Sequence, residues 1–115
     1  YALGGVTATG LAGGLVGSPD GGTIMHCYSI GAVVGGSTSG GLIGQRRYTY
    51  DALPTVSGSF WDIQSSGMTE SLGGEGRTTV QMMDKNTFAA AGWDFDEVWN
   101  IEDGFTYPYL RWAFE

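Results

Sequence analysis

A repeat of 27 residues is the feature of this sequence that most restricts how the chain can fold. The segment Gly-Gly-Leu-Val-Gly at residues 13–17 returns as Gly-Gly-Leu-Ile-Gly at residues 40–44. The same offset aligns residues 1–6 with residues 28–33. Two separate blocks that share one offset indicate a repeat architecture, in which each unit buries its apolar face against its neighbours.

The next copy of the repeat is enlarged. Residues 27–29 begin 14 positions after their Gly-Gly pair, whereas residues 59–61 begin 19 positions after theirs. The five extra residues fall within residues 45–55. Insertions in repeat proteins form loops on one face of the structure. A projecting loop is therefore expected to carry Arg46, Arg47, Tyr48, Tyr50 and Asp51.

Each repeat contains short strand-like segments separated by turn signals. The segments are residues 15–16, 23–28 and 33–34, and Gly-Gly or Pro-Asp-Gly-Gly sequences stand between them. This pattern predicts an all-β fold, a right-handed parallel β-solenoid (β-helix) of about two to three coils, with a small mixed α/β cap at the C-terminus. Glycines are expected to supply positive φ at the corners, and Leu15 is expected to stack on Leu42.

The last third of the chain predicts a closing segment. We assign residues 1–76 to the glycine-rich repeats and residues 77–115 to a C-terminal cap within the same structural domain, because the open end of a repeat stack needs covering. The tryptophans Trp61, Trp93, Trp99 and Trp112 are expected in the core or the cap. The expected cap elements are a helix at 78–83 with Thr78 or Thr79 as N-cap, a helix at 86–91 with Asn86 as N-cap, and aromatic strands at 93–95, 98–101 and 107–112.

Composition and charge exclude several classes of partner. The hydrophobic content of 42% and the periodic glycines favour a folded repeat over disorder. A net charge of −7 argues against nucleic acid and against anionic membrane surfaces. No apolar run reaches the length of about 20 residues that spans a bilayer, so membrane insertion is not expected. No signal peptide is present, and the chain opens inside a repeat at Tyr1, so the upstream part of a parent chain is an expected neighbour.

Several motifs together resemble the GLUG repeat of bacterial surface proteins. The repeat itself is matched by Gly-Gly-Leu-Val-Gly at 13–17, Gly-Gly-Thr-Ile at 21–24 and Cys-Tyr-Ser at 27–29. The later motifs are similar to those that close GLUG arrays: Ser-Phe-Trp-Asp at 59–62, Gly-Gly-Glu-Gly at 73–76, Ala-Gly-Trp-Asp-Phe at 91–95 and Tyr-Pro-Tyr-Leu at 107–110. The resemblance covers nearly the whole chain. It implies a module of a large secreted or cell-surface adhesin, without catalytic residues.

The function expected first is a non-catalytic structural and adhesive module of a larger extracellular or cell-surface bacterial protein. It would display loops to a protein or glycan on a cell surface, and the candidate binding residues are Arg46, Arg47, Tyr48 and Tyr50. Tyrosines can stack on sugars, and arginines can hydrogen-bond acidic sugars. Two alternatives are a carbohydrate-binding module that uses exposed aromatics and a filament subunit that self-associates through the solenoid ends.

No arrangement of residues points to an enzyme or a cofactor. His26 is the only histidine, and Cys27 is expected on the opposite face of the strand, so a Cys–His nucleophilic pair is not expected. Cys27 is also the only cysteine and forms no intrachain disulfide. Near the C-terminus, acidic residues could supply oxygen ligands to Ca²⁺ or could form a solvated face, and their spacing does not match an EF-hand loop. These residues are Asp94, Asp96, Glu97, Glu102 and Asp103.

Overall fold

A computed structural model describes residues 1–114, and short strands and helices make up its regular structure. The glycine-rich part holds β1 (Val6–Thr7), β2 (Thr23–Met25), β3 (Tyr28–Ser29), β4 (Val33–Val34), β5 (Thr55–Ser57), β6 (Phe60–Asp62) and β7 (Glu75–Arg77). The C-terminal part holds α1 (Thr79–Met82), α2 (Lys85–Ala89), β8 (Trp99–Asn100), β9 (Tyr109–Leu110) and the 3-10 helix η1 (Arg111–Phe114).

Strand register confirms the predicted repeat. β1 pairs in parallel with β4 at an offset of 27 residues. An isolated parallel bridge between Val16 and Ile43 keeps the same offset. β2 pairs in parallel with β5 at an offset of 32, with Thr23 opposite Thr55. The five additional residues therefore enter between Ile43 and Thr55, where the sequence placed them.

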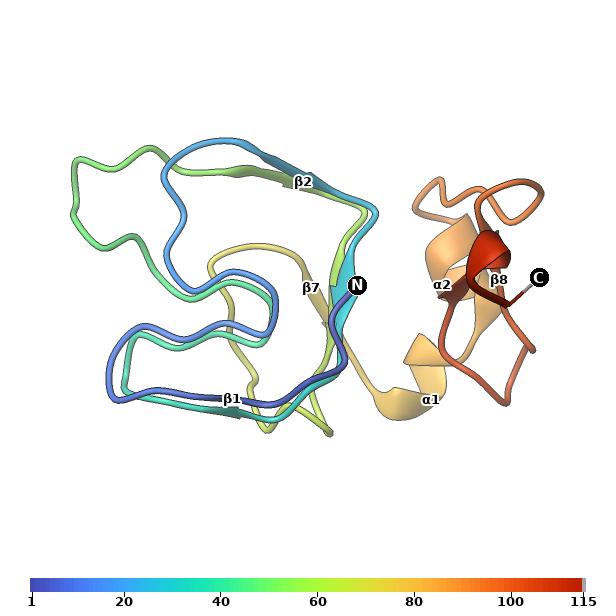
Figure 1. Ribbon diagram of the computed structural model, residues 1–115, viewed down its shortest axis with the longest axis horizontal. Coiled ribbons are helices and arrows are strands. Elements are labelled where there is room, and N and C mark those ends of the chain that lie inside the picture. The colour runs from blue at the N-terminus through green and yellow to red at the C-terminus, as the bar shows by residue number, and fades with distance from the viewer. Residues whose placement is uncertain (115) are drawn as a thin grey trace.

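The predicted β-solenoid of about two to three coils is not present, and this prediction was wrong. The strands have two or three residues each, and they lie in separate sheets of two or three strands that are neither closed nor wound into a coil. The described chain is also not all-β, because α1 and α2 follow the repeats. An antiparallel strand pair, β8–β9, comes after these helices. In Figure 1 the backbone of the glycine-rich part changes direction soon after these short strands.

Gly13 and Gly40 of the repeat motif are required by close packing rather than by backbone angle, whereas Gly21 and Gly22 have the positive φ that was expected at corners. A Cβ atom at Gly13 would stand 2.0 Å from the Val16 carbonyl oxygen, and one at Gly40 would stand 2.0 Å from the Ile43 carbonyl oxygen. Neither glycine has a positive φ. The motif is thus conserved between the two repeats because the backbone approaches itself where a side chain would not fit.

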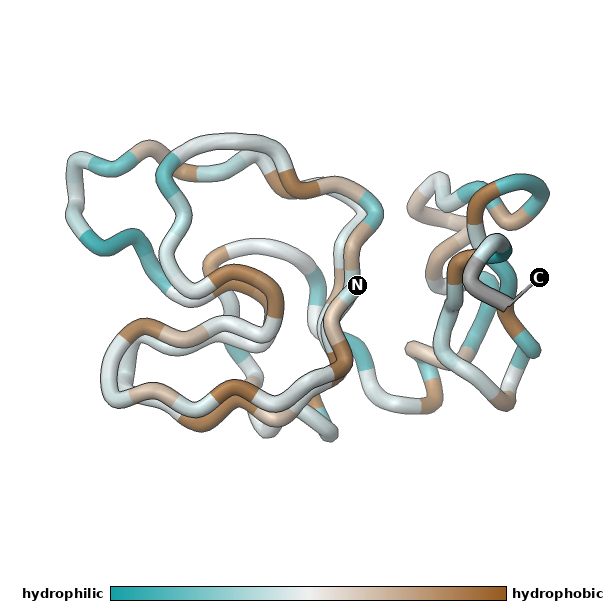
Figure 2. The backbone as a smooth tube through the Cα atoms, in the orientation of Figure 1, coloured by the Kyte–Doolittle hydropathy of each residue, from teal (hydrophilic) through white to brown (hydrophobic). Residues whose placement is uncertain are grey.

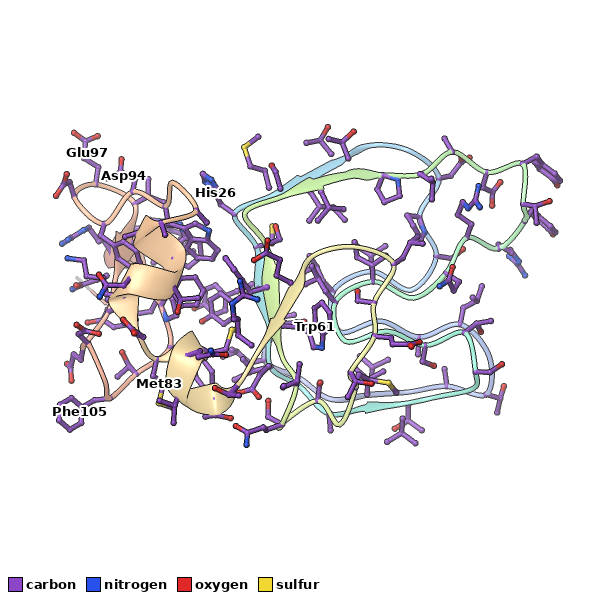
Figure 3. All side chains as sticks on the ribbon, turned by 180° about the vertical axis from the view of Figure 1, so that it is seen from behind. His26, Trp61, Met83, Asp94, Glu97 and Phe105 are labelled. Carbon is purple, nitrogen blue, oxygen red and sulfur yellow. The ribbon has the colours of Figure 1, made fainter. Side chains whose placement is uncertain are left out.

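The sheet β3-β6-β7 forms a wall between two apolar clusters. Tyr28 and Phe60 face the C-terminal part, whereas Trp61 lies within the glycine-rich part (Figure 3). The first cluster consists of Tyr28, Phe60, Met82, Phe88, Trp93, Phe95 and Trp99. The second consists of Leu42, Ile43 and Trp61. Neighbouring residues of one strand thus serve different cores, as alternation along a strand requires.

The C-terminal part lies beside the repeats (Figure 1). Its aromatic rings pack against Tyr28 and Phe60. Of the tryptophans expected in the core or cap, Trp61, Trp93 and Trp99 are buried, but Trp112 is 71% exposed and that prediction was wrong. No strand forms at residues 93–95.

The predicted N-cap residue is correct for α1 and wrong for α2. The Thr78 side chain accepts the Gln81 N–H and the Gln81 side chain accepts the Thr78 N–H, so Thr78 caps α1 as predicted. α2 begins after Asp84, whose carboxylate accepts the Asn86 N–H at 2.9 Å. Asn86 is therefore inside the helix and is not its N-cap, because the acidic residue two positions earlier takes that role.

Candidate functional site

The five-residue insertion forms an exposed loop at one end of the molecule. Residues 45–52, which we name the Tyr-Arg loop, project from the glycine-rich part at the end opposite the C-terminal part (Figure 1, green, at the left). Figure 2 shows this stretch as predominantly hydrophilic. At its tip the Asp51 N–H donates to the Tyr48 carbonyl oxygen at 3.1 Å, and the Asp51 carboxylate accepts the Tyr48 N–H at 3.1 Å. These two hydrogen bonds close a β-turn and fix the tip.

The tip presents two stacked aromatic rings to solvent. The centroids of the Tyr48 and Tyr50 rings are 5.1 Å apart, and the ring planes differ by 5°. Tyr48 is 50% exposed and Tyr50 is 80% exposed. The Arg47 guanidinium carbon lies 5.9 Å from the Tyr48 ring centroid, within the range of a cation–π contact. Arg47, Tyr48 and Tyr50 therefore form one exposed surface on the loop that the sequence predicted.

Arg46 differs from the other three predicted binding residues. Its guanidinium Nη1 donates to the carbonyl oxygens of Thr49 and Asp51, at 3.0 and 3.1 Å. Arg46 is half-buried, and its side chain spans the turn from inside. It therefore supports the loop conformation and does not share the exposed surface.

The base of the Tyr-Arg loop is tied to the preceding repeat. The Ala52 N–H donates to the Asp20 carboxylate at 2.9 Å, and the Gly21 N–H donates to the Ala52 carbonyl oxygen at 2.7 Å. Sequence reasoning identified the Pro-Asp-Gly-Gly segment at 19–22 as a turn but missed Asp20 as a support of the loop. The sequence did contain a signal for this role, because an aspartate side chain in a turn commonly accepts hydrogen bonds from backbone N–H groups.

Charge is unevenly distributed along the molecule. Residues 1–72 contain four acidic residues and two arginines, which are Arg46 and Arg47, whereas residues 73–115 contain eight acidic and three basic residues. The acidic C-terminal part and the Tyr-Arg loop lie toward opposite ends of the 40 Å long axis (Figure 1). At physiological ionic strength the electrostatic screening length is about 8 Å, which is much shorter than the 40 Å axis. An anion that approaches the loop is therefore little affected by the acidic end.

His26 and Cys27 are accounted for by local structure. His26 lies at the corner between β2 and β3, facing the C-terminal part (Figure 3), and its ring centroid is 5.9 Å from that of Trp93. Its φ of 49° is left-handed, and the residue at the same corner of the next repeat is Gly58, with φ 54°. The Cys27 thiol donates to the Met25 carbonyl oxygen at 3.2 Å. Both residues thus have structural contacts at a corner of the fold.

The acidic residues considered as Ca²⁺ ligands stabilise two separate turns. The Asp94 carboxylate accepts the N–H groups of Asp96 and Glu97, each at 2.9 Å. The Asp103 carboxylate accepts the Lys85 N–H at 3.0 Å. Within residues 1–114, no group of three or more His, Cys, Asp or Glu side chains is arranged to hold a metal ion.

One fully buried carboxylate, that of Asp62, joins the two parts of the chain. It accepts the hydroxyl groups of Tyr107 at 2.6 Å and Thr79 at 2.7 Å. It also accepts the backbone N–H groups of Gln64 at 2.8 Å and Ser65 at 3.0 Å. Sequence reasoning missed this residue, although an aspartate inside the apolar run Phe60–Ile63 was a visible signal.

The electrostatics of Asp62 follow from its partners. Burial raises the pKa of Asp62, but the hydrogen bonds from its four donors outweigh burial and hold the pKa below its ordinary value. Burial and the hydrogen bond to this carboxylate raise the pKa of Tyr107. Asp62 therefore stays ionised, and Tyr107 stays protonated, at neutral pH.

Acid is expected to weaken the fold through Asp62. Because its pKa is lower in the folded state than the value of about 3.9 in an unfolded chain, its contribution is present above about pH 4 and is lost as the pH falls through the folded pKa. Denaturant titrations across this range should show the free energy of unfolding falling with decreasing pH. The Asp62→Asn variant should show a smaller acid dependence, and an identical dependence in both proteins would contradict this role of Asp62.

A small cavity lies where the strands meet α2. Its volume is about 190 Å³, below the range of roughly 300–1,000 Å³ of ordinary small-molecule sites. On one wall Arg77 pairs with Glu75 at 2.5 Å and lies over the Phe60 ring, with its guanidinium carbon 5.4 Å from the ring centroid. Since its arginine is already paired, this cavity is a weaker candidate for a binding site than the Tyr-Arg loop.

The chain is similar to one segment of a much longer protein. Over 114 residues it is 37% identical to a protein of Evansella cellulosilytica named "Putative Gly-rich membrane protein". The match covers 95% of this chain, which spans about 13% of the length of that relative. No family model matches the chain, and no solved structure matches its fold.

The helices of residues 1–114 do not include a membrane span. The longest of them, α2, has five residues, and none combines the length and apolar character that a bilayer crossing needs.

Proposed function

We propose that the chain is a non-catalytic structural and adhesive module of a larger bacterial cell-envelope protein, and that the Tyr-Arg loop is its contact surface. The observation that carries this proposal is the stacked pair Tyr48–Tyr50, which is exposed yet held by hydrogen bonds at its tip and base. Exposed aromatic and arginine side chains are the residue types that contribute most to binding at protein surfaces.

Rigidity of the loop supports this proposal. A binding loop that is already ordered loses little conformational freedom on association. The Asp51 carboxylate and the Arg46 guanidinium both brace the turn from within the loop, and Asp20 holds its base. The remaining side chains at the tip, Arg47 and Tyr50, are free to meet a partner.

Placement in the cell envelope is supported by two further observations. The relative that contains a segment like this one is named a membrane protein, and it is far longer than this chain. The motif resemblance to GLUG-repeat surface proteins independently implies a secreted or cell-surface location. In this proposal the glycine-rich part acts as a compact scaffold, and the parent protein supplies the attachment to the envelope.

Binding to surface material should depend on the aromatic pair. We expect the double variant Tyr48→Ala/Tyr50→Ala to lose at least about tenfold in affinity for bacterial-surface glycans and extracellular proteins displayed on an array. Because both side chains are exposed, the free energy of unfolding should change by no more than about 0.5 kcal/mol.

The matched control is Phe105→Ala. Phe105 is an 81% exposed aromatic on the C-terminal part, labelled in Figure 3. This variant should bind like the wild-type protein. Equal binding by the double variant, or a loss seen only with Phe105→Ala, would remove the Tyr-Arg loop from the contact surface.

A further inference from the structure

We infer that the Tyr-Arg loop binds an acidic sugar, a pyranose ring stacked on Tyr50 with a carboxylate held by Arg47. This inference rests on the proposed function and names the ligand class of the same surface. It requires a flat face for the sugar ring, an unpaired cation for its carboxylate, and a distance between them that one short oligosaccharide can span.

The flat face is supplied by Tyr50. Its ring is parallel to that of Tyr48, and 80% of the residue is exposed, so the ring surface turned away from Tyr48 is open to solvent. A tyrosine offers an apolar face and a polar hydroxyl at its edge. A pyranose has the matching arrangement, with C–H groups on its faces and hydroxyl groups around its rim.

The cation is supplied by Arg47. Residues 1–114 contain one ion pair, between Arg77 and Glu75. The Arg47 guanidinium therefore has no carboxylate partner within these residues. The acidic residues of the loop region are engaged, since Asp51 accepts the Tyr48 N–H and Asp20 accepts the Ala52 N–H. A guanidinium presents a planar fork of donors that fits a carboxylate with two parallel hydrogen bonds. Arg47 is exposed, so solvent reaches its guanidinium donors while the group lies 5.9 Å from the Tyr48 ring centroid.

The spacing between the two groups suits a short acidic oligosaccharide. The Arg47 guanidinium carbon is 5.9 Å from the Tyr48 centroid, which is 5.1 Å from the Tyr50 centroid. The Arg47 guanidinium carbon and the Tyr50 ring centroid are therefore separated by no more than these two distances laid end to end. A ligand with a charge on every unit is less suitable, because Arg47 is exposed on the loop while Arg46 is engaged with backbone carbonyl oxygens.

Two disaccharides that differ in one group test the inference. Cellobiouronic acid carries a carboxylate where cellobiose carries a hydroxymethyl group, and calorimetry can compare their dissociation constants. We expect the wild-type protein to bind the acid at least about tenfold more tightly than cellobiose, since the charged hydrogen bonds to Arg47 form only with the acid. The preference should weaken when salt is raised.

Three variants separate the contributions of the side chains. Arg47→Gln should bind both disaccharides equally, and Arg47→Lys should keep part of the preference because an ammonium lacks the planar fork. Tyr50→Ala should lower the affinity for both disaccharides by a similar factor. Unchanged thermal unfolding of each variant would confirm that the fold is intact.

Other outcomes distinguish this inference from the function on which it rests. Equal binding of the two disaccharides by the wild-type protein, a preference that survives in Arg47→Gln, or binding of neither disaccharide would overturn the acidic-sugar assignment. The proposed function would still stand if Tyr48→Ala/Tyr50→Ala lost binding on the array. If the double variant also bound the array like the wild-type protein, the acidic-sugar assignment and the proposed function would both fail.

Discussion

Replacing Gly31 by alanine is expected to destabilise the protein by about 3 kcal/mol or more, whereas the same change at Gly4 is expected to be nearly neutral. The two glycines occupy the same repeat position, 27 residues apart. A Cβ at Gly31 would stand 1.9 Å from the Gly4 carbonyl oxygen, but one at Gly4 would meet nothing within 4 Å. The colliding atom is backbone, so a side chain at Gly31 must push two repeats apart, which is a severe form of overpacking.

Thermal and denaturant unfolding of the two alanine variants measure this difference. A loss of about 3 kcal/mol corresponds to a decrease in Tm of roughly 10–20 °C in a domain of this size. Gly4→Ala could even gain about 0.4–1 kcal/mol, because alanine restricts the unfolded chain. Similar stabilities of the two variants would show that the repeats do not approach each other at Gly31 as closely as described.

Removal of the buried Asp62 carboxylate should have an effect of similar size. Asp62→Ala leaves two hydroxyl donors and two backbone N–H donors without their acceptor, and each hydrogen bond to a charged group contributes about 1.5–3 kcal/mol. Some donors will find water, so we expect a total loss of about 3 kcal/mol or more. The bonds join β6 to α1 and to the segment before β9, so the loss should also loosen the contact between the two parts of the chain.

Two conservative variants serve as controls for Asp62. Asp62→Asn keeps the shape and one acceptor oxygen and should lose less than Asp62→Ala. Tyr107→Phe removes a single hydroxyl donor and should cost about 1.5–3 kcal/mol. A stable Asp62→Ala variant with unchanged near-ultraviolet circular dichroism would be incompatible with a joining role for this carboxylate.

The repeat register was predictable because the pairing partners share sequence. The offset of 27, its change to 32 and the exposed insertion all follow from aligning short motifs, and the strand pairs bear them out. The absence of a solenoid was not predictable in this way. Alignment gives which residues lie side by side, but the length of each strand depends on where the backbone turns back on itself, and glycine permits many such turns.

The packing of the C-terminal part also depends on information that local patterns lack. Tyr28 and Phe60 form a core with Phe88 and Trp93 on the outer side of the sheet. Their large rings bury more surface against other aromatics than the glycine-rich interior can offer. Trp61, one residue along, fills that interior instead, where glycines make room for its indole ring.

The candidate site was predictable in its location and only partly in its arrangement. The five extra residues pointed to an exposed loop, and Arg47, Tyr48 and Tyr50 are on its surface. The stacking of the two rings and the inward position of Arg46 depend on the turn closed by Asp51, whose geometry is not encoded in residue type alone.

Mapping the bound ligand by NMR tests the central claim most directly, namely that the Tyr-Arg loop is the contact surface of this module. Cellobiouronic acid would be titrated into the ¹⁵N-labelled protein while the amide shifts are followed. The account predicts saturable shifts confined to residues 45–52 and to the supporting turn at Asp20. Shifts centred on the cavity residues Phe60, Thr87 and Ala90 would contradict it, whereas the absence of saturable shifts at any amide would contradict the acidic-sugar assignment alone.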